Sequence, residues 1–78
     1  MKKTVLITGA GGFLGREILN QLLAERLYKI IAFDLVKVQC DDSYNFESYD
    51  ISDWENGIIP FDKVDYLINC AFSRSNKG

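Results

Sequence analysis

The sequence of 78 residues has no histidine, two cysteines and one proline. Cys40 and Cys70 have no histidine to complete a ligand set and no zinc-type spacing, so they predict no metal site. No apolar run approaches the ~20 residues that a membrane-spanning helix needs, and the N-terminus does not resemble a secretory signal. We therefore expect a cytoplasmic protein with free thiols and no membrane contact.

Basic patches are also absent, and the net charge of −2 conceals an uneven distribution. Residues 34–65 hold nine acidic residues against two lysines, whereas residues 1–33 hold five basic residues against two acidic ones. The acidic middle of the chain would repel a nucleic-acid backbone. The sequence therefore predicts no nucleic-acid partner, and most of these acids are expected on solvated loops.

The composition is that of a folded protein, with 47% apolar residues, and the length allows one small domain. A chain of this size buries only about 60% of its unfolded surface, so its margin of stability is expected to be thin.

The most informative segment, Thr8–Gly15, reads T-G-A-G-G-F-L-G. Lys3–Thr8, which leads into it, is short, β-branched and apolar, as in a strand buried in a parallel sheet. From Phe13 to about Glu25 the apolar residues follow a helical period. These residues are Leu14, Ile18, Leu19, Leu22 and Leu23. The glycines therefore lie where a strand becomes a helix.

Glycines at such a junction favour a phosphate ligand. The first amides of a helix have no intrahelical acceptor, and the helix dipole makes that end electropositive. Glycine allows the tight turn, exposes the backbone to a pyrophosphate and lets the helix pack closely on the strand, and these roles suit Gly9, Gly12 and Gly15. The predicted cofactor-binding residues of this segment are Gly9, Gly11, Gly12, Phe13, Leu14 and Gly15. The alternative is a glycine-rich turn with no ligand.

The spacing of the glycines is G-x-x-G-x-x-G. It differs from the G-x-G-x-x-G fingerprint because position 14 is leucine, and no Gly-Lys-Ser/Thr follows, which excludes a phosphate-loop nucleotidase. A second buried strand is expected at Lys29–Phe33. Asp34 follows it, 19 residues after Gly15, where a carboxylate can accept hydrogen bonds from adenosine ribose hydroxyls. It would repel a 2′-phosphate, which favours NAD over NADP, although Lys37 leaves that preference open; the alternative is a solvated loop aspartate.

These residues resemble the opening of the extended short-chain dehydrogenases, the NAD-dependent epimerase/dehydratase family, which acts largely on nucleotide sugars. The motif T-G-x-x-G-F-L-G follows a Val-Leu-Ile strand, as in the family. The resemblance continues through Phe33-Asp34, Asp50-Ile51 and Asn69-Cys70-Ala71-Phe72. It therefore covers the whole chain, but only the first part of the family's length.

The resemblance implies an α/β fold of the Rossmann type: a partial parallel sheet of about four strands in the order 3-2-1-4, with helices on both faces. Phe46–Tyr49 and Tyr66–Ala71 are expected to be the third and fourth strands. In the family, residues at the positions of Asp50 and Ile51 touch the adenine. Asp50 could equally cap a short helix after the third strand, on which Trp54 would pack against the sheet.

At the end of the fourth strand the family has small residues that let the ribose and pyrophosphate approach, so Cys70 and Ala71 are predicted cofactor contacts. The family's catalytic tyrosine, followed by a lysine four residues later, has no counterpart. The residues four positions after the tyrosines are Ala32, Ser48, Asp53 and Cys70. We therefore predict no catalytic residue in this chain.

Residues 1–78 are accordingly interpreted as the N-terminal part of a NAD(P)-binding Rossmann domain from which the catalytic part is absent. The intact protein would be an NAD-dependent epimerase, dehydratase or reductase. The alternatives are a stand-alone NAD-binding or regulatory module without catalysis, and a structural remnant that binds nothing. Because the fourth strand would expose an edge, self-association through it is also expected.

Overall fold

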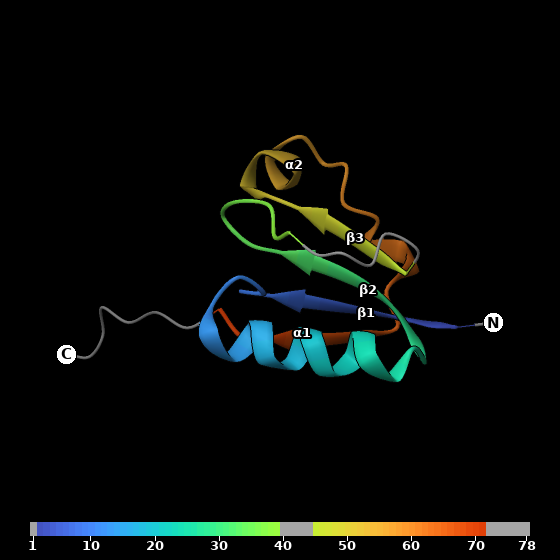
Figure 1. Ribbon diagram of the computed structural model, residues 1–78. Helices are drawn as coiled ribbons and strands as arrows, with labels where there is room; N and C mark the ends of the chain where they lie inside the picture. The colour runs from blue at the N-terminus through green and yellow to red at the C-terminus, as the bar shows by residue number, and fades with distance from the viewer. Residues whose placement is uncertain (1, 40–44, 72–78) are drawn as a thin grey trace.

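Four short strands form one parallel sheet with helices on both faces (Figure 1). The computed structural model describes residues 2–39 and 45–71. Its elements are β1 (Lys3–Thr8), α1 (Phe13–Glu25), β2 (Tyr28–Phe33), β3 (Phe46–Tyr49), α2 (Ile51–Glu55), a 3-10 helix η1 (Phe61–Lys63) and β4 (Tyr66–Asn69).

The strand order is β3-β2-β1-β4, which confirms the predicted order 3-2-1-4. In the register, Lys3 pairs with Tyr28 and Thr8 with Phe33, and Thr8 also pairs with Asn69 on the other side of β1. Because every pairing is parallel, all four strands end at the same edge of the sheet. Segments that follow those strand ends, far apart in the sequence, are thereby brought together.

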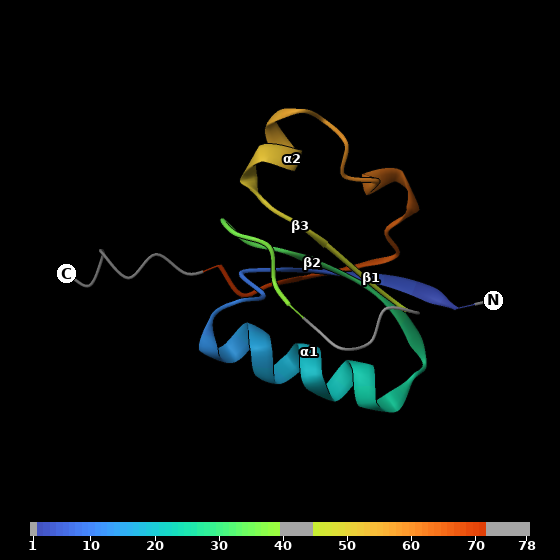
Figure 2. The same ribbon diagram turned by 45° about the horizontal axis from the view of Figure 1, so that its top comes forward.

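One face of the sheet packs against α1, and we call it the α1 face (Figure 2). Val5 and Ile7 of β1 and Ile30 and Ala32 of β2 are buried there around Leu19 of the helix. Alternate residues of a strand point to the same face, so this apolar set is what the strand pattern requires. Leu14 differs from the expectation: it is 47% exposed, because the first turn of α1 extends past the arrowhead of β1 (Figure 1).

The opposite face is covered by α2 and η1, and we call it the α2 face (Figure 2). Trp54 of α2 packs its ring 5.5 Å from the ring of Phe33 in β2 and 5.3 Å from that of Phe61. This contact gives Trp54 the packing role that the sequence predicts. In the part of the chain that the structure describes, no helix is long and apolar enough to cross a membrane.

Two strand boundaries differ from the predicted ones. β2 begins one residue earlier, at Tyr28, and β4 ends at Asn69 rather than Ala71. The chain leaves β4 there because the Ala71 N–H donates a hydrogen bond of 3.0 Å back to the Asn69 side chain. Cys70 is a free thiol, whereas Cys40, for which a free thiol is also predicted, lies outside the described residues.

Candidate functional site

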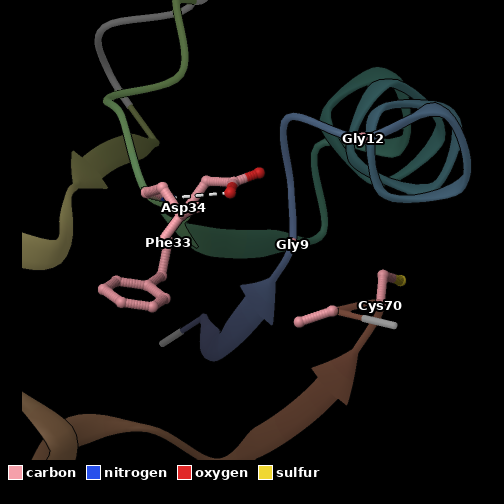
Figure 3. Close-up of a pocket in the computed structure, with 7 residues that line it drawn as sticks. Gly9, Gly12, Phe33, Asp34 and Cys70 are labelled. Atoms are coloured by element: carbon pink, nitrogen blue, oxygen red, sulfur yellow. Dashed lines mark hydrogen bonds between the residues drawn. The ribbon is translucent and has the colours of Figure 1, made fainter. Parts of the chain in front are cut away.

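A hollow of about 420 Å³ opens at the edge where the parallel strands end (Figure 3). Its lining comes from the segments that follow three different strands. The residues are Gly9 and Gly12 after β1, Phe33, Asp34 and Leu35 at the end of β2, and Cys70 and Ala71 after β4. Five of the predicted site residues are therefore brought together: Gly9, Gly12, Asp34, Cys70 and Ala71.

Gly9 makes the turn out of β1 with a φ of +69°, a conformation that side chains with a Cβ rarely adopt. A Cβ at this position would also lie 2.7 Å from the backbone nitrogen of Ala71. The end of β4 thus packs directly on the Gly9 backbone. Glycine is required here by the protein itself, with or without a ligand.

Gly15 has a similar structural reason, one turn into α1. A Cβ on Gly15 would collide with the Gly9 carbonyl oxygen and lie 2.8 Å from the Ala10 Cα. The helix can therefore approach the end of β1 only because position 15 has no side chain.

Gly12 is different, because none of the described residues lies so close that a side chain at position 12 would collide with it. Its φ of −77° is open to other residues, and a Cβ would have only the Gly9 carbonyl oxygen nearby, at an ordinary 3.5 Å. Gly12 nevertheless lines the hollow. Its missing side chain enlarges the space in front of the helix rather than relieving a contact.

The helix that begins after Gly12 has an unsatisfied start. No side chain in the described part of the chain caps α1, and the first turn of this helix contains no acidic residue. By contrast, α2 has a complete capping box, in which Asp50 and Asp53 accept hydrogen bonds from each other's backbone N–H groups at 3.1 and 2.8 Å. The backbone N–H groups of Phe13, Leu14 and Gly15 at the start of α1 are available to an anion. The side chains of Phe13 and Leu14 are exposed and do not line the hollow.

Asp34 ties the end of β2 to the glycine turn. Its Oδ2 accepts a hydrogen bond of 2.7 Å from the Gly11 N–H. Its Oδ1 accepts one of 2.7 Å from the Leu35 N–H (Figure 3). A Cβ on Gly11 would lie 2.9 Å from Asp34 Oδ2, so the missing side chain at position 11 leaves room for the carboxylate. Each carboxylate oxygen has a further lone pair, and the group lines the hollow as a hydrogen-bond acceptor.

Asp50 and Ile51 lie at the same edge of the sheet but do not line the hollow. The Asp34 N–H donates to the Tyr49 carbonyl oxygen at 3.3 Å. Asp50, the residue after Tyr49, therefore lies close to the end of β2. Asp50 is the N-cap of α2, which is the alternative that the sequence left open. A contact of Asp50 and Ile51 with adenine stays a prediction.

Two residues near the hollow are not among the predicted site residues. Arg16 donates from Nη1 to the Gln39 carbonyl oxygen at 2.9 Å and so holds the segment after Asp34 against α1. Asn69 Oδ1 accepts from the Thr8 hydroxyl at 2.7 Å and from the Ala71 N–H at 3.0 Å, linking the ends of β1 and β4. Arg16 lies 23 positions from its partner, and no local pattern gives that pairing.

Among the described residues, the titrating groups whose pKa values are shifted lie away from the hollow, on β3. Burial and the neighbouring Glu47 carboxylate raise the pKa of Tyr49 to about 12, and its hydroxyl donates to Glu47 at 2.9 Å. That hydrogen bond, together with the Lys29 ammonium at 3.2 Å, holds the pKa of Glu47 below its usual value despite partial burial. A raised tyrosine pKa is the opposite of what an acid–base catalyst near neutral pH needs. Among the described residues no group of side chains could hold a metal ion.

Comparisons with known proteins bear on the family and the fold. The model of one family, described as the NAD dependent epimerase/dehydratase family, matches residues 5–78. Among solved structures, the chain is similar to dTDP-glucose 4,6-dehydratase from Bacillus anthracis strain Ames, crystallised in complex with NAD, with a TM-score of 0.73 and 23% sequence identity. The match covers 94% of this chain and 28% of the dehydratase chain, and this likeness shows the fold alone. Comparison with curated proteins gives no significant match.

Proposed function

The chain belongs to the NAD dependent epimerase/dehydratase family, and from this premise we propose that the hollow at the carboxyl edge of its sheet binds NAD. The pyrophosphate would lie in front of Gly12, on the first backbone N–H groups of α1. The adenosine ribose hydroxyls would donate to the Asp34 carboxylate. Gly9, Cys70 and Ala71 would form the wall behind the cofactor.

The observation that carries this proposal is the start of α1. Gly9 and Gly15 are explained by packing, but Gly12 and the uncapped N–H groups of Phe13, Leu14 and Gly15 are not. A diphosphate accounts for both, because it needs bare backbone and hydrogen-bond donors at the positive end of a helix dipole. By contrast, α2 in the same chain has a capping box, so side chains of the protein already accept hydrogen bonds at its start.

The charges around Asp34 favour NAD over NADP. A 2′-phosphate would meet the Asp34 carboxylate, whose like charge repels it. Lys37, which the sequence leaves as a possible phosphate partner, lies 3.8 Å from the Asp53 carboxylate instead. Arg16 is engaged with the Gln39 carbonyl oxygen. Both cations are therefore already directed at other acceptors.

The proposed role of this unit in an intact protein is to hold the adenosine half of the cofactor. Bound NAD would supply hydride transfer, and this chain's residues would supply its binding and orientation. The likeness to dTDP-glucose 4,6-dehydratase favours a nucleotide-sugar substrate, but this chain spans only 28% of that protein's length.

Isothermal titration calorimetry with NAD, ADP-ribose and NADP tests the proposal. We expect NAD and ADP-ribose to bind with similar affinity, because the proposed contacts all lie in the half that they share, and NADP to bind more weakly. An NAD affinity far above that of ADP-ribose would instead indicate that the chain also grips the nicotinamide. Absence of NAD binding would refute the proposal.

A further inference from the structure

The segment that follows Asp34, Leu35–Gln39, begins at the wall of the candidate site. Leu35 lines the hollow and is 69% exposed, and the segment turns from the end of β2 toward α1 (Figure 2). It belongs to no helix or strand, so no ladder of backbone hydrogen bonds holds it. Its position therefore depends on the separate contacts that its residues make.

Two of these contacts join the segment to β3 and to the glycine turn. The Val38 N–H donates to Ser48 Oγ at 2.8 Å, and the Val38 side chain is buried in the core of the α1 face. A Cβ on Gly11 would lie 3.6 Å from Val38 Cγ2, so Val38 also packs beside the glycine turn. Both contacts hold the segment at Val38.

A third contact, made by Arg16, joins the end of the segment to α1. Arg16 Nη1 donates to the Gln39 carbonyl oxygen at 2.9 Å, and the charge of the guanidinium strengthens this hydrogen bond. In the part of the chain that the structure describes, no carboxylate lies within ion-pair distance of Arg16. Arg16 follows Gly15 near the start of α1, so it ties the segment to the same end of the helix that would hold the pyrophosphate.

We propose that Arg16 is a positioning residue, which holds the segment after Asp34 against α1 before the cofactor binds. This inference rests on the proposed NAD site. The ribose would donate to Asp34, and the pyrophosphate would meet the N–H groups of α1, so the adenosine half needs both parts in a fixed relation. A segment that is already in place loses less conformational entropy on binding, which raises the affinity.

A cation at this position could instead attract a cofactor phosphate directly. The two roles differ in their dependence on Asp34. A positioning effect reaches the cofactor through Asp34, whereas the attraction between a guanidinium and a phosphate acts without it. The hydrogen bond from Arg16 to the Gln39 carbonyl oxygen favours the positioning role.

Calorimetry with NAD and ADP-ribose on Arg16→Met tests the proposal. Methionine keeps an unbranched side chain but has no donor for the Gln39 carbonyl oxygen. We expect both dissociation constants to rise about three- to tenfold, as for the loss of one hydrogen bond. Inorganic pyrophosphate, followed by amide NMR, should bind to the start of α1 as it does in the unaltered chain, because it makes no contact with Asp34. A variant that had merely lost its fold would bind all three ligands less tightly.

Arg26→Met is the matched control. It removes the same charge from the same helix, but Arg26 is the exposed C-cap of α1, at the end away from the hollow. This control should bind NAD and ADP-ribose as the unaltered chain does. Circular dichroism checks that both variants are folded.

A double-mutant cycle separates positioning from a direct phosphate contact. In an Asp34→Ala background, Arg16→Met should raise the dissociation constant of ADP-ribose by less than about twofold, because the carboxylate that the segment places is gone. An equal loss of affinity with and without Asp34, or weaker binding of pyrophosphate by Arg16→Met, would indicate a direct contact and overturn the proposal.

The same titrations distinguish this inference from the proposed function. If the unaltered chain binds neither NAD nor ADP-ribose, the proposed function fails and the role of Arg16 fails with it. If the unaltered chain binds both ligands and Arg16→Met binds them as tightly, the NAD site stands and the positioning role alone is refuted.

Discussion

Asp34 makes two backbone hydrogen bonds at the candidate site, to the N–H groups of Gly11 and Leu35. Asp34→Ala should therefore weaken NAD binding by about 1–3 kcal/mol, since the ribose loses a charged acceptor and the glycine turn loses its tie to β2. Calorimetry with NAD and ADP-ribose should show the same loss for both ligands. Asp62→Ala, which removes an exposed acid of η1, is the control, and an unchanged affinity in Asp34→Ala would remove Asp34 from the site.

Tyr49 predicts a pH dependence of stability in alkaline solution. Its pKa is raised to about 12 in the folded chain, against an ordinary value of 10.0. Between these two values the unfolded chain loses the tyrosine proton while the folded chain keeps it, so the free energy of unfolding should fall as the pH rises. Urea unfolding at a series of pH values should show a smaller fall in Tyr49→Phe than in the unaltered chain.

Tyr66→Phe, at an exposed position on another strand, serves as the control for that measurement. In the Tyr66→Phe variant, the free energy of unfolding should fall with rising pH as much as it does in the unaltered chain. An identical pH profile for Tyr49→Phe and the unaltered chain would contradict the assignment of this loss to the Tyr49–Glu47 pair.

At the scale of single residues, the sequence predicts where a residue lies in the fold better than it predicts which residue it contacts. The spacing of 19 residues from Gly15 predicts the role of Asp34 at the end of β2, because dinucleotide-binding folds have an acidic residue about 20 positions after the glycine motif. The hydrogen bond from Gly11 to Asp34 and the contact of Arg16 with Gln39 each span 23 positions. Such contacts depend on how the glycine turn and the segment after β2 fold against each other, which no local period expresses.

At the start of α1, Gly15 is needed for packing, whereas Gly12 faces the proposed ligand. Gly15→Ala should destabilise the fold by about 1–3 kcal/mol or more, because the new Cβ collides with the backbone of the Gly9 turn. Gly12→Ala should cost less stability, because its φ is ordinary and its Cβ has room. It should nevertheless weaken NAD binding by about 1–3 kcal/mol, since the methyl group would fill space proposed for the pyrophosphate.

Thermal unfolding and calorimetry on the two variants check this contrast. The account requires Gly12→Ala to lose affinity while it keeps most of its stability. A Gly12→Ala variant that binds NAD as tightly as the unaltered chain would show that the hollow in front of α1 does not hold the pyrophosphate.

The elements with strong local signals were predicted with their correct bounds. β1 and α1 match Lys3–Thr8 and Phe13–Glu25, because a β-branched run and a helical period flank glycines that fix the junction. β4 ends two residues before the predicted end, because the Ala71 N–H donates to the Asn69 side chain instead of continuing the strand. Leu14 fits the helical stripe but is exposed, since periodicity does not show where a helix extends past its sheet.

For the whole molecule, the strand order and the two-faced arrangement followed from the resemblance of motifs spread along the chain, and the structure confirms them. The location of the hollow follows from the same order, since parallel strands that end together bring the glycine turn, Asp34 and Cys70 to one edge. The roles of the individual glycines could not be separated in advance. Packing distances at Gly9 and Gly15 distinguish them from Gly12.

The measurement that tests the central claim most directly is a titration of the unaltered chain with NAD, followed by two-dimensional amide NMR. We predict saturable shifts that are largest for the amides of residues 11–15, with further shifts at Asp34, Leu35, Cys70 and Ala71. The amides of Lys29 and Glu47, on a face of the sheet away from the hollow, should move little. Saturable shifts centred on that other face, or no saturable shift at the start of α1, would contradict the proposed NAD site.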